Sequence, residues 1–151
     1  MPQSLDNVLI HVIFSTRERM PFLCDCDLRR KTHAYMAGVI RKLGCAPIQI
    51  GGVADHVHLL VAISRTITIA DFVKETKRAT TDWLKNGDPE VPNFHWQRGY
   101  GVFSVSESAR DEVTRYIASQ EAHHRRTDYQ SEFRKFCEKH GLEIDERYAW
   151  D

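Results

Sequence analysis

The sequence predicts an α+β fold: a ferredoxin-like β-α-β-β-α-β core with a four-stranded antiparallel sheet, followed by C-terminal helices. Two observations support this prediction. Short apolar, β-branched segments alternate in that order with two longer segments of helical apolar spacing, and more helix-like sequence follows the last expected strand. Both core helices of such a fold cover one sheet face. We therefore expect the C-terminal helices to form a lid over the other face.

Length and charge favour one domain with local binding patches. The chain has 151 residues, 42% of them hydrophobic, which is enough for one well-buried domain and too short for two. We expect a single domain over 1–151, with a core at about 5–106 and the C-terminal helices at about 107–151. Lys plus Arg equals Asp plus Glu, 21 each, so any binding of a polyanion must come from local basic patches.

The cysteine spacing and the hydropathy pattern suggest the compartment. The four cysteines form no Cys-x-x-Cys pair and no zinc-finger spacing, which favours free thiols over a disulfide framework. The chain shows no basic-then-apolar leader and no apolar run near the roughly 18 residues of a membrane span. We therefore expect a cytoplasmic protein that does not contact the membrane.

The first strand and the first helix have clear signatures. Val8–Phe14 is a nearly continuous apolar run, typical of a strand buried on both faces, and His11 is its one polar member. A segment with helical apolar spacing follows, and Asp25 or Asp27 can cap its start. Gly44 is expected to end this helix.

The next two strands are expected to form a hairpin. Proline cannot donate to a ladder, so Pro47–Ile50 is expected at a sheet edge, with Gly51-Gly52 as the turn into a strand at Ala54–Ile63. Side chains two apart on a strand share a face, so His56 and His58 point together. The residues of the opposite face, which would pack under the two helices, are Val57, Leu59, Val61 and Ile63.

His56 and His58 are candidate metal ligands. Two neutral imidazoles at this spacing can converge on one divalent cation, and a strand holds them more rigidly than a loop. The pattern is short, so by itself it fits a half-exposed sheet face equally well. His11 lies on the expected neighbouring strand, where it fits either support of such a site or a satisfied core histidine.

The second helix combines an apolar stripe with a basic face. Thr68 and Asp71 have the spacing of a capping box, and Asn86-Gly87 closes the helix. Its basic side fits either a contact surface for a phosphate backbone or an ordinary solvated face. The basic turn before the first helix fits the same two interpretations. The candidate DNA contacts are Arg17, Arg19, Lys74, Lys77, Arg78 and Lys85.

The sequence after the last core strand, expected at Gly101–Val105, predicts a third helix that Ser108 caps, with Asp111 three residues on. Tyr116 and Gln120 lie four apart on this helix and share a face, and His123 lies not far round. A phenol and an amide would then point at whatever this face covers. His123 is a candidate support for a site there; with His124 it also fits DNA contact or capping of the helix end.

The last part of the chain is expected to form one more helix. Thr127 and Gln130 have the spacing of a capping box, so we expect a break before them and a helix that ends at Gly141. The tail 142–150 has enough apolar bulk to dock on the rest of the domain.

Three motifs stand out: Asp55–Leu60 (DHVHLL), Trp96–Tyr100 (WQRGY) and Tyr116–His124 (YIASQEAHH). In this order and at this spacing, they resemble those of the single-tyrosine HUH transposases, the small enzymes of insertion sequences that move as single-stranded DNA. The resemblance implies His56 and His58 as metal ligands, Gln120 as the third ligand and Tyr116 as the catalytic nucleophile. It also implies Mg²⁺ or Mn²⁺, and a homodimer in which the tyrosine helix of one subunit can complete the other's site.

The implied chemistry is consistent with these residue types. A tyrosine that attacks phosphorus conserves the energy of the broken phosphodiester in a covalent bond, so a second DNA end can rejoin without ATP. A divalent metal acts as a Lewis acid on the scissile phosphate. The hypothesis is a transposase that cleaves and rejoins single-stranded DNA at hairpin-bearing element ends through a 5′-phosphotyrosine.

Three alternatives stay open beside this hypothesis. One is a domesticated relative that acts on repeated palindromes of its host genome. Another is a catalytically inactive module that binds single-stranded or hairpin DNA and keeps the sheet. The third is a metal phosphoesterase with paired His-x-Thr or His-x-Ser motifs, but the second motif of such a pair is absent from the sequence.

Overall fold

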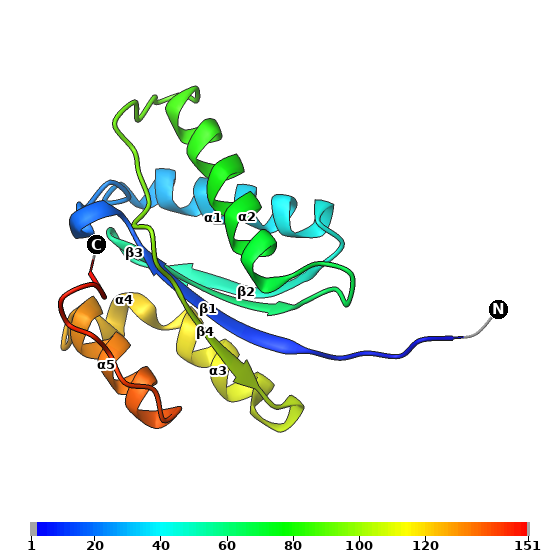
Figure 1. Cartoon of the computed structure of the whole chain (residues 1–151). Helices are drawn as coiled ribbons and strands as arrows, with labels where there is room; N and C mark the ends of the chain where they lie inside the picture. Colours follow the sequence, from blue (N-terminus) through cyan, green and yellow to red (C-terminus); the bar gives the residue numbers. More distant parts are fainter. Residues whose placement is uncertain (1–2, 151) are drawn as a thin grey trace.

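A four-stranded antiparallel sheet lies between two sets of helices in the computed structural model, which describes residues 3–150 (Figure 1). The strands are β1 (Leu9–Ser15), β2 (Ala46–Gly52), β3 (His56–Ala62) and β4 (Gly101–Val105). Their order in the sheet is β2-β3-β1-β4. The predicted α+β class and the ferredoxin-like strand order are therefore confirmed, and β2 is an edge strand as its proline predicts.

The helices cover both faces of this sheet (Figure 1). α1 (Cys26–Lys42) and α2 (Ile69–Lys85) lie on one face. α3 (Arg110–Ala118), α4 (Gln120–His123) and α5 (Tyr129–Lys139) lie on the other. Two short 3-10 helices, η1 (Arg17–Arg19) and η2 (Glu107–Ala109), lead into α1 and α3. The C-terminal helices thus form the expected lid.

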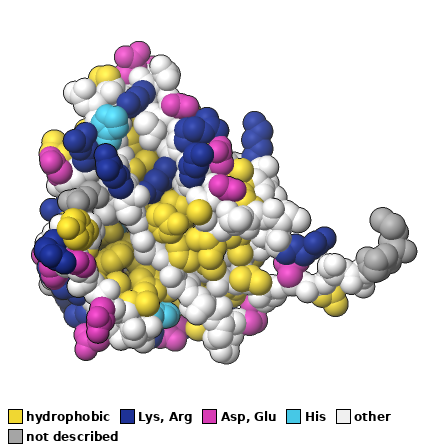
Figure 2. Space-filling view, viewed as in Figure 1, with side chains coloured by type: hydrophobic (Ala, Val, Ile, Leu, Met, Phe, Trp, Pro, Cys, Tyr) yellow, Lys and Arg dark blue, Asp and Glu magenta, His cyan; other side chains and the backbone are white. Residues whose placement is uncertain are grey.

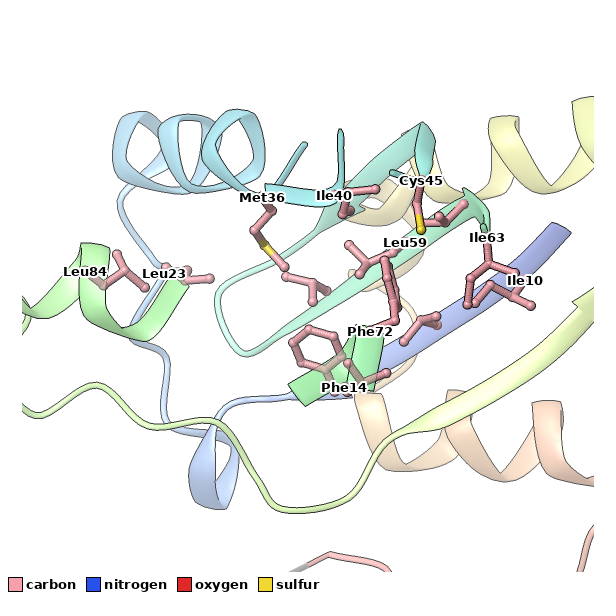
Figure 3. Close-up of a cluster of buried hydrophobic side chains, with 14 of the residues drawn as sticks. Ile10, Phe14, Leu23, Met36, Ile40, Cys45, Leu59, Ile63, Phe72 and Leu84 are labelled. Atoms are coloured by element: carbon pink, nitrogen blue, oxygen red, sulfur yellow. The ribbon is translucent and has the colours of Figure 1, made fainter. Parts of the chain in front are cut away.

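The larger core lies between the sheet and α1 with α2 (Figure 3). Phe14 of β1, Leu59 of β3 and Phe72 of α2 are fully buried in it. Residues of β3 reach this core at every second position because side chains alternate along a strand. The four apolar residues predicted to pack under the helices do so: Val57, Leu59, Val61 and Ile63.

The helix caps show which local signals hold. Asp25 accepts hydrogen bonds from the backbone N–H groups of Asp27 (2.8 Å) and Leu28 (3.1 Å), and Thr68 accepts one from the N–H of Asp71 (3.0 Å), as expected. The predicted capping by Ser108 is wrong: η2 leads directly into α3, and the Ser108 hydroxyl pairs with that of Ser106.

The cap of α5 is also one residue later than predicted. Asp128, and not Thr127, caps this helix by accepting a hydrogen bond from the N–H of Ser131 (2.8 Å). A carboxylate competes well for this position because it also interacts favourably with the positive helix N-terminus. The tail docks as expected, since Ile144 and Trp150 pack against a smaller core cluster that includes Phe103 and Tyr129.

Gly51 and Gly52 do not form the predicted turn. They are the last residues of β2 and pair with His58 and Val57 of β3. The reason for glycine at position 51 is a close approach of α3: a Cβ there would lie 2.3 Å from the backbone oxygen of Ile117. This glycine therefore lets the helix that carries Tyr116 pack tightly on the sheet.

Two further findings concern the cysteines and the helices. The four cysteines are free thiols; Cys24 and Cys26 are exposed, whereas Cys45 and Cys137 are buried. Within residues 3–150, no helix has both the length and the apolar character needed to cross a bilayer.

Candidate active site

The two histidines of β3 lie on the sheet face that the C-terminal helices cover. His56 is opposite Ser15 of β1 and His58 is opposite Ile13, and both side chains are fully buried. This burial excludes the alternative that His56 and His58 line a half-exposed sheet face. Because the alternation of β3 places the large core on its other side, the burial of these imidazoles comes from α3 to α5.

Four side chains on this face meet at one point: His56, His58, His124 and Glu132. One ligand atom from each of them lies within 4.8 Å of the others. The Glu132 Oε1 atom is 2.9 Å from the Nε2 atom of His58, 3.1 Å from that of His124 and 3.5 Å from that of His56. Glu132 is only 2% exposed, so this is a buried carboxylate surrounded by imidazoles.

Each of these three imidazoles also has a partner at its outer nitrogen. The Nδ1 atom of His56 is 2.7 Å from Asp55 Oδ1, and that of His58 is 2.8 Å from His11 Nε2. The Nδ1 atom of His124 is 2.8 Å from the Thr127 carbonyl oxygen. Such outer partners fix the ring orientation and direct Nε2 toward the centre, as they do in metal sites. His11 is thus fully buried and also supports the group through His58.

Burial and hydrogen bonds decide the charges of this group. Burial lowers the pKa of His58 to about 4 and that of His11 to about 3, so both are neutral at pH 7, as a ligand and its supporting residue should be. Burial also acts against protonation of His56, but hydrogen bonds to Asp55 and Glu132 outweigh it and raise its pKa. Burial opposes ionisation of Glu132, but hydrogen bonds from the histidines outweigh it and hold the pKa of this carboxyl well below its usual range.

Tyr116 on α3 contacts the other side of the same carboxylate. Its hydroxyl donates to Glu132 Oε2 and is 3.2 Å from His123 Nε2. Its ring centroid is 5.8 Å from that of His58. Burial and the adjacent Glu132 carboxylate raise the pKa of Tyr116, so its hydroxyl is a held, neutral donor.

Tyr116 lines a cavity of about 280 Å³. The lining also includes His123 of α4 and Glu132, Phe136 and Lys139 of α5. The nucleophile candidate is therefore reachable from solvent, although the two β3 histidines are not.

Gln120 lies close to Tyr116 but not on the same helix. The expected continuous helix breaks at Ser119, whose hydroxyl donates to the Tyr116 carbonyl (3.1 Å) and competes with the main-chain ladder. The Gln120 side-chain amide donates to the same carbonyl (3.4 Å), and its buried Oε1 has no hydrogen-bond partner within residues 3–150. No hydrogen bond in that part of the chain joins Gln120 to His56 or His58.

Glu132 is the residue that the sequence analysis missed. The signal for it is its position: it lies on the face of α5 that otherwise carries Tyr129, Phe133 and Phe136, three aromatic side chains that pack on the core. An acidic residue within an apolar stripe must find a partner when it is buried. That argument could have drawn attention to Glu132, although not to its partners.

The second sequence motif connects elements around the site. Gln97 accepts hydrogen bonds through Oε1 from the Ser15 backbone N–H (2.8 Å) and from the Tyr129 hydroxyl (3.0 Å). It therefore joins the end of β1 to the start of α5. Lys77 holds the same loop by donating to the carbonyls of Gln97 (2.8 Å) and Gly99 (3.0 Å).

The candidate DNA contacts differ in availability. Burial lowers the pKa of Lys77 to about 8, and its ammonium is used by the loop carbonyls. Arg78 forms an ion pair with Glu75 (2.6 Å), whereas Lys74 is exposed. Figure 2 shows Lys and Arg side chains over the region of α2 and the following loop, with Asp and Glu among them, so this face is not uniformly basic. Arg17 is exposed and Arg19 is half-buried in η1.

Known proteins with a similar sequence or a similar fold are transposases. The model of the IS200-like transposase family matches residues 4–120. The ISDra2 transposase TnpA of Deinococcus radiodurans is 34% identical over 71 residues, which are 44% of this chain and 51% of that protein. This chain thus spans about half the length of its curated relative.

Two solved structures share the fold. A crystal structure assigned to a transposase from Deinococcus radiodurans R1 has a TM-score of 0.63 and 25% identity, covering 80% of this chain and 95% of that one. A REP-associated tyrosine transposase bound to a REP hairpin has a TM-score of 0.59, covering 82% and 72%. Its identity is 13%, so this second likeness concerns the fold alone. Because the family model covers most of the chain, the protein belongs to the IS200-like transposase family.

Proposed function

We propose that this transposase cleaves and rejoins single-stranded DNA at hairpin-bearing element ends, with Tyr116 as the nucleophile. The observation that supports this most is the position of Tyr116. Its hydroxyl donates to Glu132 at the edge of the buried histidine group, and half-buried Tyr116 lines a cavity of about 280 Å³. A phenol placed beside potential metal ligands has the arrangement that attack on a phosphodiester requires.

The proposed cleavage step transfers a phosphoryl group to tyrosine. The Tyr116 phenolic oxygen bonds to phosphorus while the bond from phosphorus to the 3′ oxygen breaks. The 5′ end stays on the enzyme as phosphotyrosine, and the departing 3′ oxygen takes up a proton. The phenolic proton passes to His123 Nε2, which lies 3.2 Å from the phenolic oxygen. Attack by the 3′ hydroxyl of another DNA end reverses these bonds and rejoins the strand.

A divalent metal fits the donor set of this site. His56 and His58 are buried, their outer nitrogens are held by Asp55 and His11, and their Nε2 atoms face the centre. When bound, the metal would neutralise charge on the phosphate and polarise it. Imidazole donors favour Mn²⁺ over Mg²⁺ within the pair that the family resemblance implies. Gln120 as the third ligand stays a prediction.

Hairpin DNA is the proposed partner because one structural neighbour carries a REP hairpin. Exposed Lys74 and Arg17, together with Arg19 and Lys85, are the proposed contacts to its phosphates. Lys77 and Arg78 are weaker candidates, because each already binds a group of this chain. A homodimer stays a prediction, and sedimentation with and without hairpin DNA would test it.

The proposal is tested by trapping the covalent intermediate. Labelled single-stranded hairpin oligonucleotides from the flanks of the gene are incubated with the protein and Mn²⁺, Mg²⁺ or EDTA, then separated on a denaturing gel. We expect a metal-dependent labelled protein band for the wild type and for Tyr129→Phe, and none for Tyr116→Phe. Tyr129 is the matched control because its ring lies 4.9 Å from that of His56.

Hairpin binding without an adduct or a cut product under any metal would overturn this function. The protein would then be a DNA-binding module that keeps the transposase fold.

A further inference from the structure

We propose that Glu132 and His124 complete the metal site in place of Gln120, and that the same Glu132 carboxylate positions the Tyr116 hydroxyl. This inference rests on the proposed function, because it names the ligands of the same site. It makes α5 part of the catalytic centre and not merely its cover. Glu132 is then a metal ligand through one oxygen and a positioning residue through the other.

Ligand atoms of four side chains converge on one point. The Nε2 atoms of His58, His124 and His56 lie 2.9, 3.1 and 3.5 Å from Glu132 Oε1. The Nε2 atoms of His56 and His124 are 3.0 Å from each other. Three nitrogens and one carboxylate oxygen around one point form a donor set that suits a divalent transition metal.

The second argument is the orientation of His124. Its Nδ1 atom is 2.8 Å from the Thr127 carbonyl, an acceptor, so Nδ1 carries the proton and donates it. When a metal displaces the second ring proton, the lone pair lies on Nε2, which faces His56 and Glu132. A main-chain carbonyl on the outer nitrogen is a usual way to hold a metal-binding histidine. His124 is therefore oriented in the same way as the two histidines of β3.

The third argument is the burial of a carboxylate without a permanent cation. Glu132 forms ion pairs with histidines only, and no Lys or Arg pairs with it within residues 3–150. A buried carboxylate is costly unless a cation or several hydrogen bonds compensate it. Hydrogen bonds from the histidines and from Tyr116 supply that compensation in the metal-free protein, and a divalent cation among these imidazoles would take the place of the histidine protons.

Gln120 is the competing ligand, because its buried Oε1 has no partner in the described residues. No hydrogen bond within residues 3–150 nevertheless joins it to an imidazole of the group. The side-chain amide bonds to the Tyr116 carbonyl and also interacts with the Tyr116 side chain, and Gln120 lines a different cavity beside α1, β2 and α4. Glu132 in contrast contacts all three imidazoles and also receives the Tyr116 hydroxyl.

The shared carboxylate has a mechanical consequence. Glu132 Oε1 faces the metal ligands while Oε2 accepts from Tyr116 and lies 3.1 Å from His123 Nε2. Metal binding should therefore order α5 and fix the direction of the nucleophile at the same time. A ligand supplied by Gln120 would couple the metal to α4 instead.

The test measures Mn²⁺ binding to the metal-free full chain by calorimetry. We expect Glu132→Gln to weaken Mn²⁺ binding by about tenfold or more, and Gln120→Ala to change it less than about twofold. Glu138→Gln is the matched control, because Glu138 is an exposed glutamate on the same helix. Loss of binding in Gln120→Ala with wild-type binding in Glu132→Gln would overturn the inference.

A second measurement needs no variant and covers the case in which Glu132→Gln does not fold. Amide hydrogen exchange of the wild type is followed with and without Mn²⁺. We expect slower exchange in 129–139 as well as in β3. Protection confined to β3 and 116–123 would contradict a ligand on α5.

The two proposals fail in different ways. A wild type that forms no DNA adduct with any metal refutes the proposed function. A wild type that forms the adduct, with Glu132→Gln equal to it in Mn²⁺ binding and adduct yield, refutes only the role of Glu132.

Discussion

The two faces of the sheet differ in how they are built. The face under α1 and α2 is a continuous apolar core, whereas the face under α3 to α5 holds buried imidazoles, a carboxylate and a phenol beside two smaller apolar clusters. The same strand serves both, because Val57 and Leu59 point into the core while His56 and His58 point into the site. We expect the first face to supply most of the stability and, under the proposed function, the second to supply the chemistry. Substitutions on the two faces should therefore have separable effects.

The largest expected effect on stability comes from the apolar face. Phe72→Ala removes a fully buried ring and should lower the free energy of unfolding by about 3–5 kcal/mol. Ile69→Ala on the same helix is the control, because Ile69 is exposed and should cost less than about 1 kcal/mol. Urea unfolding measures both. If Phe72→Ala abolished the DNA adduct in molecules that are still folded, the separation of the two faces would be wrong.

A pH titration of stability examines the histidine face. In EDTA, the folded-state pKa values of His11 (about 3) and His58 (about 4) lie below the ordinary histidine pKa of 6.5 because of burial. Between these values the unfolded chain binds more protons than the folded one, so stability should fall as the pH decreases from about 6.5 to 4. His33, also buried, with a pKa of about 4, adds to this loss, whereas the raised pKa of His56 opposes it.

The net loss over this range should be roughly 1–3 kcal/mol, measured by urea unfolding at each pH. Stability that rises as the pH decreases would show that these histidines are not neutral in the folded protein.

Gly51 of β2 packs directly against α3, the helix that carries Tyr116. A substitution there should therefore affect stability and adduct formation together. Gly51→Ala places a Cβ 2.3 Å from the Ile117 backbone oxygen and should cost about 1–3 kcal/mol. It should also reduce adduct formation, because it displaces the helix that carries Tyr116. Gly38→Ala in α1 meets no atom within 4 Å and should stabilise the helix by about 0.4–1 kcal/mol. Thermal unfolding and adduct yield of the two variants check this, and equal adduct yields would contradict it.

The smallest effects come from the helix caps. Thr68→Ala and Asp128→Ala each remove a side-chain cap and should each cost about 1 kcal/mol in urea unfolding. Only Asp128→Ala should also weaken Mn²⁺ binding, because its helix carries Glu132. Equal Mn²⁺ affinities of the two variants would indicate that the start of α5 has no influence on the site.

The parts of this molecule that the sequence predicts correctly depend on local patterns. The alternation of β3 predicts which residues face the core, and the caps at Asp25 and Thr68 follow from neighbouring residues. The motif resemblance adds the family, which the comparison confirms. These signals need only a few consecutive residues, so they can be interpreted without the tertiary structure.

The rest depends on how distant segments meet. Glu132 reaches the histidines because α5 packs on the sheet face that carries them. The capping-box spacing predicts that a last helix exists, but no local pattern encodes where it packs. Gly51 looks like a turn residue until α3 is seen to pack against it. The sequence predicts Thr127 as the cap of α5, one residue before the actual cap Asp128, because Thr127 and Gln130 match the spacing of a capping box.

The central claim is that Tyr116 forms the covalent bond to DNA beside the histidine group. The most direct test digests the trapped adduct with nuclease and protease and locates the remaining nucleotide by tandem mass spectrometry. If Tyr116 is the nucleophile, we expect the added mass on the peptide that contains Tyr116, and only when a divalent metal is present. The same mass on Tyr129, or an adduct that forms equally in EDTA, would contradict it.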